Sequence, residues 1–208
     1  MARYTGPVCR LCRRERMKLY LKGAKCDTMK CPIERRPYPP GEAGRNRQRQ
    51  GSEYLLQLRE KQKARRIYGL MEKQFSRVYE EANRRQGVTG ENLLQLLELR
   101  LDNAVFRAGF ASSRNQARQF VRHGHVTVNG KRVTIPSFLL RQGDVISLHT
   151  KARKMIVIRH NIDTLDRIAP MWLDVNMGEF QATVRDLPLR EQIDVPVREQ
   201  LIVELYSK

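Results

Sequence analysis

The sequence has 208 residues, with 40 Lys and Arg against 22 Asp and Glu, which gives a formal net charge of +18 and a pI of about 10.4. This length is enough to bury a substantial hydrophobic core. No run of eighteen apolar residues occurs, which excludes a membrane span, and the first residues lack the apolar stretch of a secretory signal. We therefore expect a cytoplasmic, strongly cationic protein that binds a polyanion, with no membrane partner and no small-molecule substrate.

The excess positive charge is concentrated in the first three quarters of the chain. Residues 1–50 carry 14 Lys and Arg against 4 acids, and residues 51–100 carry 10 against 7. Residues 101–150 carry 7 against 2, whereas residues 151–208 are balanced at 9 against 9. A surface that served solubility alone would mix both signs throughout. The asymmetry therefore indicates a face that binds phosphates.

The first hundred residues predict an irregular arm followed by helices. Residues 1–50 combine cysteines, arginine pairs and a Pro/Gly cluster, which disfavours long helices. Ser52 is a suitable N-cap for a helix over 53–67. A second helix is expected over 72–85, and a third, with leucines at core spacing, begins at Thr89.

The next segment predicts small helices packed on a short twisted sheet. A Ser-x-x-Gln capping box at Ser113 opens a short helix, which Gly124 ends. The pair Asn129-Gly130 lies between two alternating strands, which is a strong signal for a hairpin. Beyond this segment the pattern predicts a helix over 154–167 and short strands over 172–175, 179–184 and 200–205.

The four cysteines follow the pattern C-x2-C-x13-C-x4-C, and the candidate metal ligands are Cys9, Cys12, Cys26 and Cys31. Four thiolates at this spacing are able to surround one structural Zn²⁺. Such a metal supplies roughly 10 kcal/mol of apparent free energy, which an arm with few apolar residues needs. A [4Fe–4S] cluster uses the same ligands and stays open as an alternative, as do two disulfides and four independent thiols.

Basic residues recur in runs over the arm and the first helix, interleaved with tyrosines that are able to pack on ribose or bases. A solvated charged face is the alternative interpretation of such runs, but their recurrence favours contact with nucleic acid. Affinity should then fall steeply with salt. The candidate RNA-binding residues in this part are Arg3, Arg10, Arg13, Arg14, Arg35, Arg36, Tyr38, Arg45, Arg47, Arg49, Lys61, Lys63, Arg65, Arg66 and Tyr68.

A second basic group lies on the short helix and the hairpin that follows it. Arg114, Arg118 and Arg122 are spaced four residues apart, so they share one helix face. We use the name cationic platform for these three arginines together with the hairpin. Such a platform is able to read the phosphates and 2′-hydroxyls of A-form RNA, although a plain surface helix is the alternative. The candidate RNA-binding residues here are Arg107, Arg114, Arg118, Arg122, His123, Asn129, Lys131 and Arg132.

Catalytic patterns are missing from the sequence. The pair His123 and His125 has no third ligand nearby, and a helix C-terminus favours histidine electrostatically. There is no P-loop, dinucleotide fingerprint or nucleophile elbow. Asp102 stands alone among basic residues and is expected to form an ion pair or a helix contact. We therefore expect no enzyme activity.

Residues 99–130, LRLDNAVFRAGFASSRNQARQFVRHGHVTVNG, closely resemble the RNA-binding module named after the bacterial small-subunit ribosomal protein S-four family. The module also occurs in pseudouridine synthases and tyrosyl-tRNA synthetases. The segments RRPYPPG (35–41), EKQKARRIYG (60–69) and EQLIVELYSK (199–208) extend the resemblance to essentially the whole chain. The cysteines are similar to those of the metal-binding branch of the family, whereas Glu42-Ala43 replaces the usual Gln-His pair.

The resemblance implies an α+β fold with three parts. These are a four-cysteine, metal-bound arm (1–45), a helical domain (46–97) completed by 190–208, and an inserted α/β RNA-binding module (98–189, with its core at 98–160). The module would pack helices on a short, mainly antiparallel twisted sheet.

The same resemblance implies a structural constituent of the small ribosomal subunit. Such a protein is a primary binder that clamps a multi-helix junction of 16S rRNA, nucleates assembly of the subunit body and supports translational accuracy. Its expected partners are 16S rRNA, ribosomal protein S-five, neighbouring small-subunit proteins and mRNA near the channel through which it enters. An RNA-modifying enzyme and a zinc-dependent nucleic-acid-binding regulator are the competing interpretations.

Overall fold

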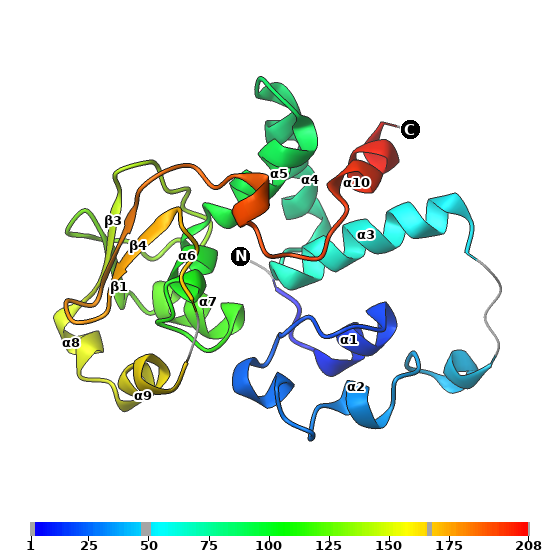
Figure 1. Cartoon of the computed structure of the whole chain (residues 1–208), viewed down its shortest axis with the longest axis horizontal. Helices are drawn as coiled ribbons and strands as arrows, with labels where there is room; N and C mark the ends of the chain where they lie inside the picture. The colour runs from blue at the N-terminus through cyan, green and yellow to red at the C-terminus, as the bar shows by residue number, and fades with distance from the viewer. Residues whose placement is uncertain (1–2, 47–50, 166–167, 208) are drawn as a thin grey trace. The chain divides into compact units, whose positions relative to one another are not determined.

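The computed structural model describes residues 3–46, 51–165 and 168–207, and the chain divides into two compact units. Unit 1 contains residues 1–93 and 195–208, and unit 2 contains residues 94–194 (Figure 1). The three-part division expected from the sequence stays a prediction. No helix within the described ranges is long and apolar enough to cross a membrane.

Unit 1 is helical. Its elements are α1 (Cys9–Glu15), η1 (Gly23–Cys26), α2 (Pro32–Arg35), η2 (Glu42–Arg45), α3 (Glu53–Ile67), α4 (Glu72–Arg84), the first half of α5 (Thr89–Glu98) and α10 (Glu199–Tyr206). The three helices expected after residue 52 are confirmed. Ser52 caps α3 as expected, because its side chain accepts a hydrogen bond from the backbone N–H of Leu55 at 3.4 Å.

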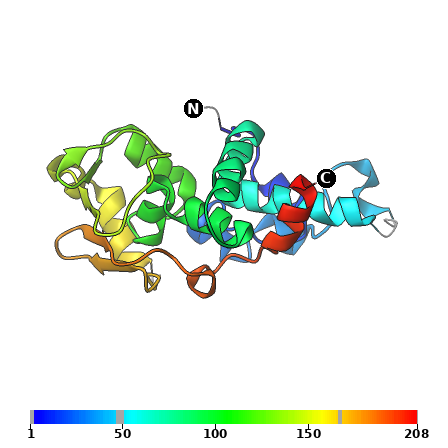
Figure 2. The ribbon, with the colours of Figure 1, turned by 90° about the horizontal axis from the view of Figure 1, so that it is seen from above.

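The C-terminal segment corrects one expectation, because the strand predicted over 200–205 is helix α10. The run of apolar and β-branched residues suggested a strand, yet Ile202 is fully buried against the rest of unit 1. Figures 1 and 2 show α10 lying beside α3. The two helices are also joined by a hydrogen bond of 2.9 Å from the Gln57 amide to the Glu204 carboxylate. Packing against α3 thus outweighs the local strand propensity.

Unit 2 contains one antiparallel sheet of five strands in the order β2-β1-β3-β5-β4. Its elements are α6 (Leu101–Arg107), α7 (Arg114–Arg122), β1 (Val126–Val128), β2 (Lys131–Arg132), β3 (Val145–Leu148), α8 (Thr150–Arg153), α9 (Ile156–Thr164), β4 (Leu173–Asn176), β5 (Gln181–Val184) and η3 (Arg190–Gln192). The predicted hairpin is confirmed, with Asn129 (φ 50°) and Gly130 (φ 76°) both in the left-handed region that a type I′ turn requires.

The core of unit 2 lies between the sheet and helices α6 and α7, which stand beside it in Figure 1. Ile146 and Leu148 of β3 alternate with half-buried residues, so one face of the strand is buried. Trp172, the single tryptophan of the chain, is 1% exposed in the same core. The helix expected over 154–167 is present as the shorter α9, preceded by α8, and residues 166–167 lie outside the described part.

Candidate nucleic-acid interface

The Arg13 side chain forms hydrogen bonds within the arm of unit 1 instead of projecting from it. Its Nε donates to the carbonyl oxygens of Arg36 at 3.1 Å and Tyr38 at 3.0 Å, and its Nη2 donates to that of Pro39 at 3.4 Å. These bonds tie α1 to the Pro-rich segment 36–39. The guanidinium therefore has a structural task that the charge pattern did not indicate.

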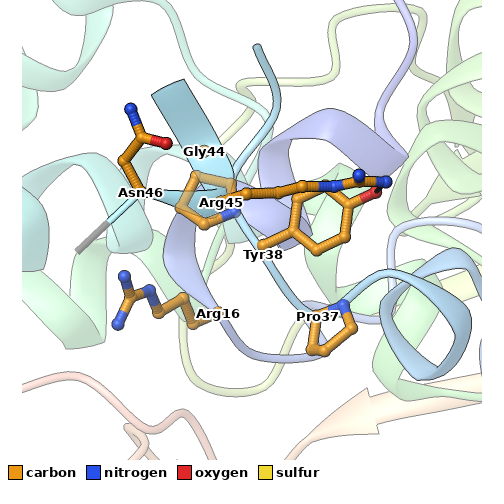
Figure 3. Close-up of a pocket in the computed structure, with 7 residues that line it drawn as sticks. Arg16, Pro37, Tyr38, Gly44, Arg45 and Asn46 are labelled. Carbon is orange, nitrogen blue, oxygen red and sulfur yellow. Dashed lines mark hydrogen bonds between the residues drawn. The ribbon is translucent and has the colours of Figure 1, made fainter. Parts of the chain in front are cut away.

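Tyr38 and Arg45 form a stacked pair within the same segment. The Arg45 guanidinium lies 5.0 Å from the centre of the Tyr38 ring, and its Nη2 donates to the phenolic oxygen at 3.0 Å. That hydrogen bond holds the pKa of Tyr38 below its usual value, with the charge of Arg45 adding to the effect. Figure 3 shows the Arg45 side chain running alongside the ring at the edge of an open pocket.

The four cysteines are brought together from α1, η1 and the start of α2. All of them line one pocket, and three are buried, while no disulfide joins them. The backbone N–H of Lys22 donates to the Cys26 sulfur at 3.4 Å. Burial raises the pKa values of Cys12 and Cys26. Within residues 3–46, 51–165 and 168–207, no group of three or more His, Cys, Asp or Glu side chains is placed to hold a metal ion.

The basic side chains expected on α3 are largely engaged within unit 1. Lys61 and Arg65 both pair with Glu72, at 2.7 Å and 3.0 Å, and Lys63 pairs with Glu60. These basic side chains are only 13–21% exposed. Their charge therefore stabilises the fold as well as contributing to the surface potential.

Arg66 and Glu15 join α3 to α1 in a buried ion pair, in which the Glu15 side chain is 2% exposed. Burial raises the pKa of Glu15 and lowers that of Arg66, and the attraction between the two charges opposes both shifts. Tyr68, expected to contact RNA, is 3% exposed in the core of unit 1. That expectation is corrected, because a ring buried at the end of α3 is not accessible to a base.

In unit 2, Arg118 is buried and is not part of the exposed cationic platform that the sequence predicted. This side chain is 5% exposed, and its Nη1 donates to Asp102 at 2.9 Å. Arg100 donates two hydrogen bonds to the same carboxylate, from Nε at 3.1 Å and from Nη2 at 2.8 Å. The ion pair expected for Asp102 is present. The platform geometry is wrong at Arg118 because helical spacing places residues on one face without showing which face is buried.

Arg107 and Arg114 are held by a second polar network. Arg107 makes two hydrogen bonds of 3.0 Å to the Glu98 carboxylate, which also accepts from the Asn103 amide at 2.8 Å. The side-chain Oδ1 of Asn103 accepts from Arg114 Nε at 2.8 Å. The Arg114 guanidinium also lies 4.5 Å from the centre of the Phe106 ring. Both arginines are thus positioned by buried partners and remain partly accessible.

The hairpin presents the exposed part of the module. Lys131 and Arg132 are exposed on β2, and Arg132 donates to the His123 carbonyl oxygen at 3.1 Å. Asn129 has a structural role, because its amide donates to Asp144 at 2.8 Å and its carbonyl oxygen accepts from the Val145 N–H at 2.9 Å. Arg122 is exposed at the end of α7.

The candidate residues therefore fall into two groups. Exposed ones are Arg3, Arg10, Arg14, Arg35, Arg36, Arg45, Arg122, His123, Asn129, Lys131 and Arg132. Partly or fully buried ones are Arg13, Tyr38, Lys61, Lys63, Arg65, Arg66, Tyr68, Arg107, Arg114 and Arg118. Arg47 and Arg49 lie outside the described residues. The sequence interpretation missed Arg16, which lines the pocket beside Tyr38, and Arg100, whose ion pair with Asp102 is invisible in a charge count.

Two family models match adjoining stretches of the chain, together covering residues 3–146. Residues 3–98 match the Ribosomal protein S4/S9 N-terminal domain, and residues 99–146 match the S4 domain. The chain is 61% identical to the small ribosomal subunit protein uS4 of Thermoanaerobacter sp. (strain X514), over the full length of both proteins. It is 60% identical to that of Acidothermus cellulolyticus and 58% identical to that of Pelobacter propionicus, again over their full lengths.

The family models and the relatives at about 60% identity indicate a nucleic-acid-binding protein of the translation apparatus. The chain belongs to the uS4 family of bacterial small ribosomal subunit proteins. The family expected from the sequence is thereby confirmed, together with the expectation of a structural ribosomal protein in the cytoplasm. The comparisons give no support to an RNA-modifying enzyme or to a zinc-dependent regulator.

Proposed function

We propose that this protein binds 16S rRNA at a multi-helix junction and holds the helices of that junction together. The distribution of paired and exposed charge carries the proposal. The buried acids Glu15, Glu98 and Asp102 fix arginines inside each unit, while the arm and the hairpin present exposed arginines and lysines. Helices of RNA repel each other, and cations between them lower that repulsion.

Binding at a junction implies an early role in assembly of the subunit. A protein that neutralises several converging phosphates stabilises the folded junction on which later proteins depend. We extend the proposal to contacts with ribosomal protein S-five, with neighbouring small-subunit proteins and with mRNA near the channel through which it enters. Support for translational accuracy would follow from that position.

A filter-binding titration of the full chain with 16S rRNA at two salt concentrations, with duplex RNA as competitor, tests the proposal. We expect tight binding that resists the duplex and falls steeply with salt. Affinity no better than that for the duplex would overturn junction recognition.

We also propose that the four cysteines hold one structural Zn²⁺, with a [4Fe–4S] cluster as the alternative. The donor set fits, because four soft sulfur ligands line one pocket and the Lys22 N–H already donates to the Cys26 sulfur. The pocket would have to tighten around the ion to bring the thiolates into a coordinating set. A bound metal would add a cross-link between α1, η1 and the start of α2 to the hydrogen bonds that Arg13 already makes.

A further inference from the structure

An open pocket lies beside the stacked Tyr38–Arg45 pair, along the segment between α2 and the end of η2. Its empty space, including the part open to solvent, is about 750 Å³. The lining residues are Arg16, Pro37, Tyr38, Pro39, Gly44, Arg45 and Asn46. No acid is among these lining residues in the described chain. The wall is therefore cationic and apolar at the same time.

The pocket is held in shape before any ligand arrives. Arg13 ties the carbonyl groups of residues 36, 38 and 39 to α1, which fixes the Pro-rich wall. Gly44 packs so closely on the Pro39 carbonyl that a Cβ atom there would lie 2.0 Å from its oxygen. The Tyr38 hydroxyl orients the guanidinium of Arg45. Such preorganisation lowers the entropy lost on binding.

The two arginines approach the pocket from different elements. Arg16 is the exposed C-cap of α1 in the left-handed conformation (φ 56°), and Arg45 ends η2. In Figure 3 the Arg16 side chain lies across the pocket from the Tyr38–Arg45 pair, and Asn46 lies near Gly44. Guanidinium groups bind phosphate oxygens, proline faces suit a base or ribose, and an asparagine amide suits a hydroxyl. The Tyr38 ring already lies against the guanidinium groups of Arg13 and Arg45.

We propose that this pocket holds a single unpaired nucleotide of RNA, with its phosphate between Arg16 and Arg45 and its base or ribose against the proline wall. In a duplex the flat faces of the bases are stacked on neighbouring base pairs, so they are not accessible to such a pocket. The base of a bulged nucleotide is accessible. The inference rests on the proposed function and adds to it a site that selects an extrahelical nucleotide. Glu42, the acid that replaces the usual residue of the family, does not line the pocket.

The test compares two RNA hairpins that share one stem, with and without a one-nucleotide bulge, each titrated with the full chain. We expect the bulge to strengthen binding by about tenfold. R16Q and R45Q should each remove most of that preference. R35Q is the matched control, because Arg35 is an exposed arginine of the same arm that does not line the pocket. It should weaken binding to both hairpins by one common factor of about two to three.

The Y38F variant tests whether the orientation of Arg45 matters apart from its charge. It keeps the ring and the charge of Arg45, and removes only the hydroxyl that accepts a hydrogen bond from Arg45. A partial loss of the bulge preference with unchanged binding to the paired hairpin supports the pocket. No preference for the bulge, or equal losses on both hairpins in R16Q, R45Q and R35Q, overturns it. If 16S rRNA is still bound tightly in that case, the proposed function stands and only the pocket fails.

Discussion

Asp102 and Arg118 form a salt bridge of 2.9 Å between α6 and α7, although each side chain is only 6% exposed. The same carboxylate binds Arg100. Arg118 Nε and Nη2 have no hydrogen-bond partner in the described part of the chain, so Asp102 is the anion that compensates this guanidinium. One carboxylate therefore pairs with two buried guanidinium groups.

Substitution D102A should destabilise unit 2 by about 3–5 kcal/mol, because it leaves buried guanidinium groups without their anion. Urea denaturation followed by the fluorescence of Trp172, the single tryptophan, measures this effect on unit 2 directly. The control is R122A, at the exposed end of the same helix, which should change stability by less than about 0.5 kcal/mol. Similar losses in both variants would contradict the assignment.

The double substitution R122Q with K131Q should weaken binding of 16S rRNA and lower the salt dependence by about two counterions, because both side chains are exposed on the platform. Binding is measured at several salt concentrations. K154Q with R159Q is a matched pair, since both residues are exposed basic residues of unit 2 away from the platform. Equal changes in the two double variants would show that only total charge matters.

We expect His125 to make the stability of unit 2 depend on pH. Burial, together with the charges of His123, Arg132 and His149, lowers its pKa below the ordinary value of 6.5. The unfolded chain then binds the proton more readily, so the free energy of unfolding decreases as pH falls through about 6.5 and levels off below the folded pKa. H125Q should flatten this slope in Trp172 fluorescence titrations. H160Q, in an exposed residue of α9, should leave the slope intact.

Substitution I202A should release α10 from α3, because Ile202 is fully buried in unit 1. We expect a loss of about 2–5 kcal/mol in unit 1, seen as faster amide hydrogen exchange in α3. V203A, at a partly exposed neighbouring position, should have a smaller effect. Protection of α3 that is unchanged in I202A would argue against the helix pairing.

Removal of two cysteine ligands, in the variant C9S with C12S, should abolish binding of zinc and make residues 3–46 sensitive to protease. Metal analysis and limited proteolysis on one preparation measure both effects. M29S, at a residue of the same arm that is 84% exposed, is the control and should keep both properties. A fully protease-resistant arm without metal would contradict a structural role for the ion.

The sequence predicted the elements whose boundaries are marked by local chemistry. Ser52, the Asn129-Gly130 turn and Gly124 each act through their own backbone or a side chain a few residues away. The leucines of α5 were correctly placed in the core because helical spacing alone brings them together. These parts of the fold require no knowledge of distant contacts.

Much of what the sequence did not show involves partners that are distant in the chain. The sequence predicted a strand at α10 because the helix is stabilised by a distant partner. That partner, α3, lies more than 130 residues away, as the Gln57–Glu204 hydrogen bond shows. Arg118 looked like a surface residue because Asp102, 16 residues earlier, gives no sign that it is buried. Arg13 was expected to contact RNA, yet its bonds run to carbonyl groups 23–26 residues further on.

Unit 1 is built from two stretches of chain, and unit 2 occupies the residues between them. During synthesis, α3 therefore leaves the ribosome long before α10 exists to cover it. Unit 2 is contiguous, so all its strands are available while the C-terminal helix is still being made, and domains generally fold as units in that order. A chain that ends before α10 would thus contain the whole of unit 2 and an α3 that α10 does not cover.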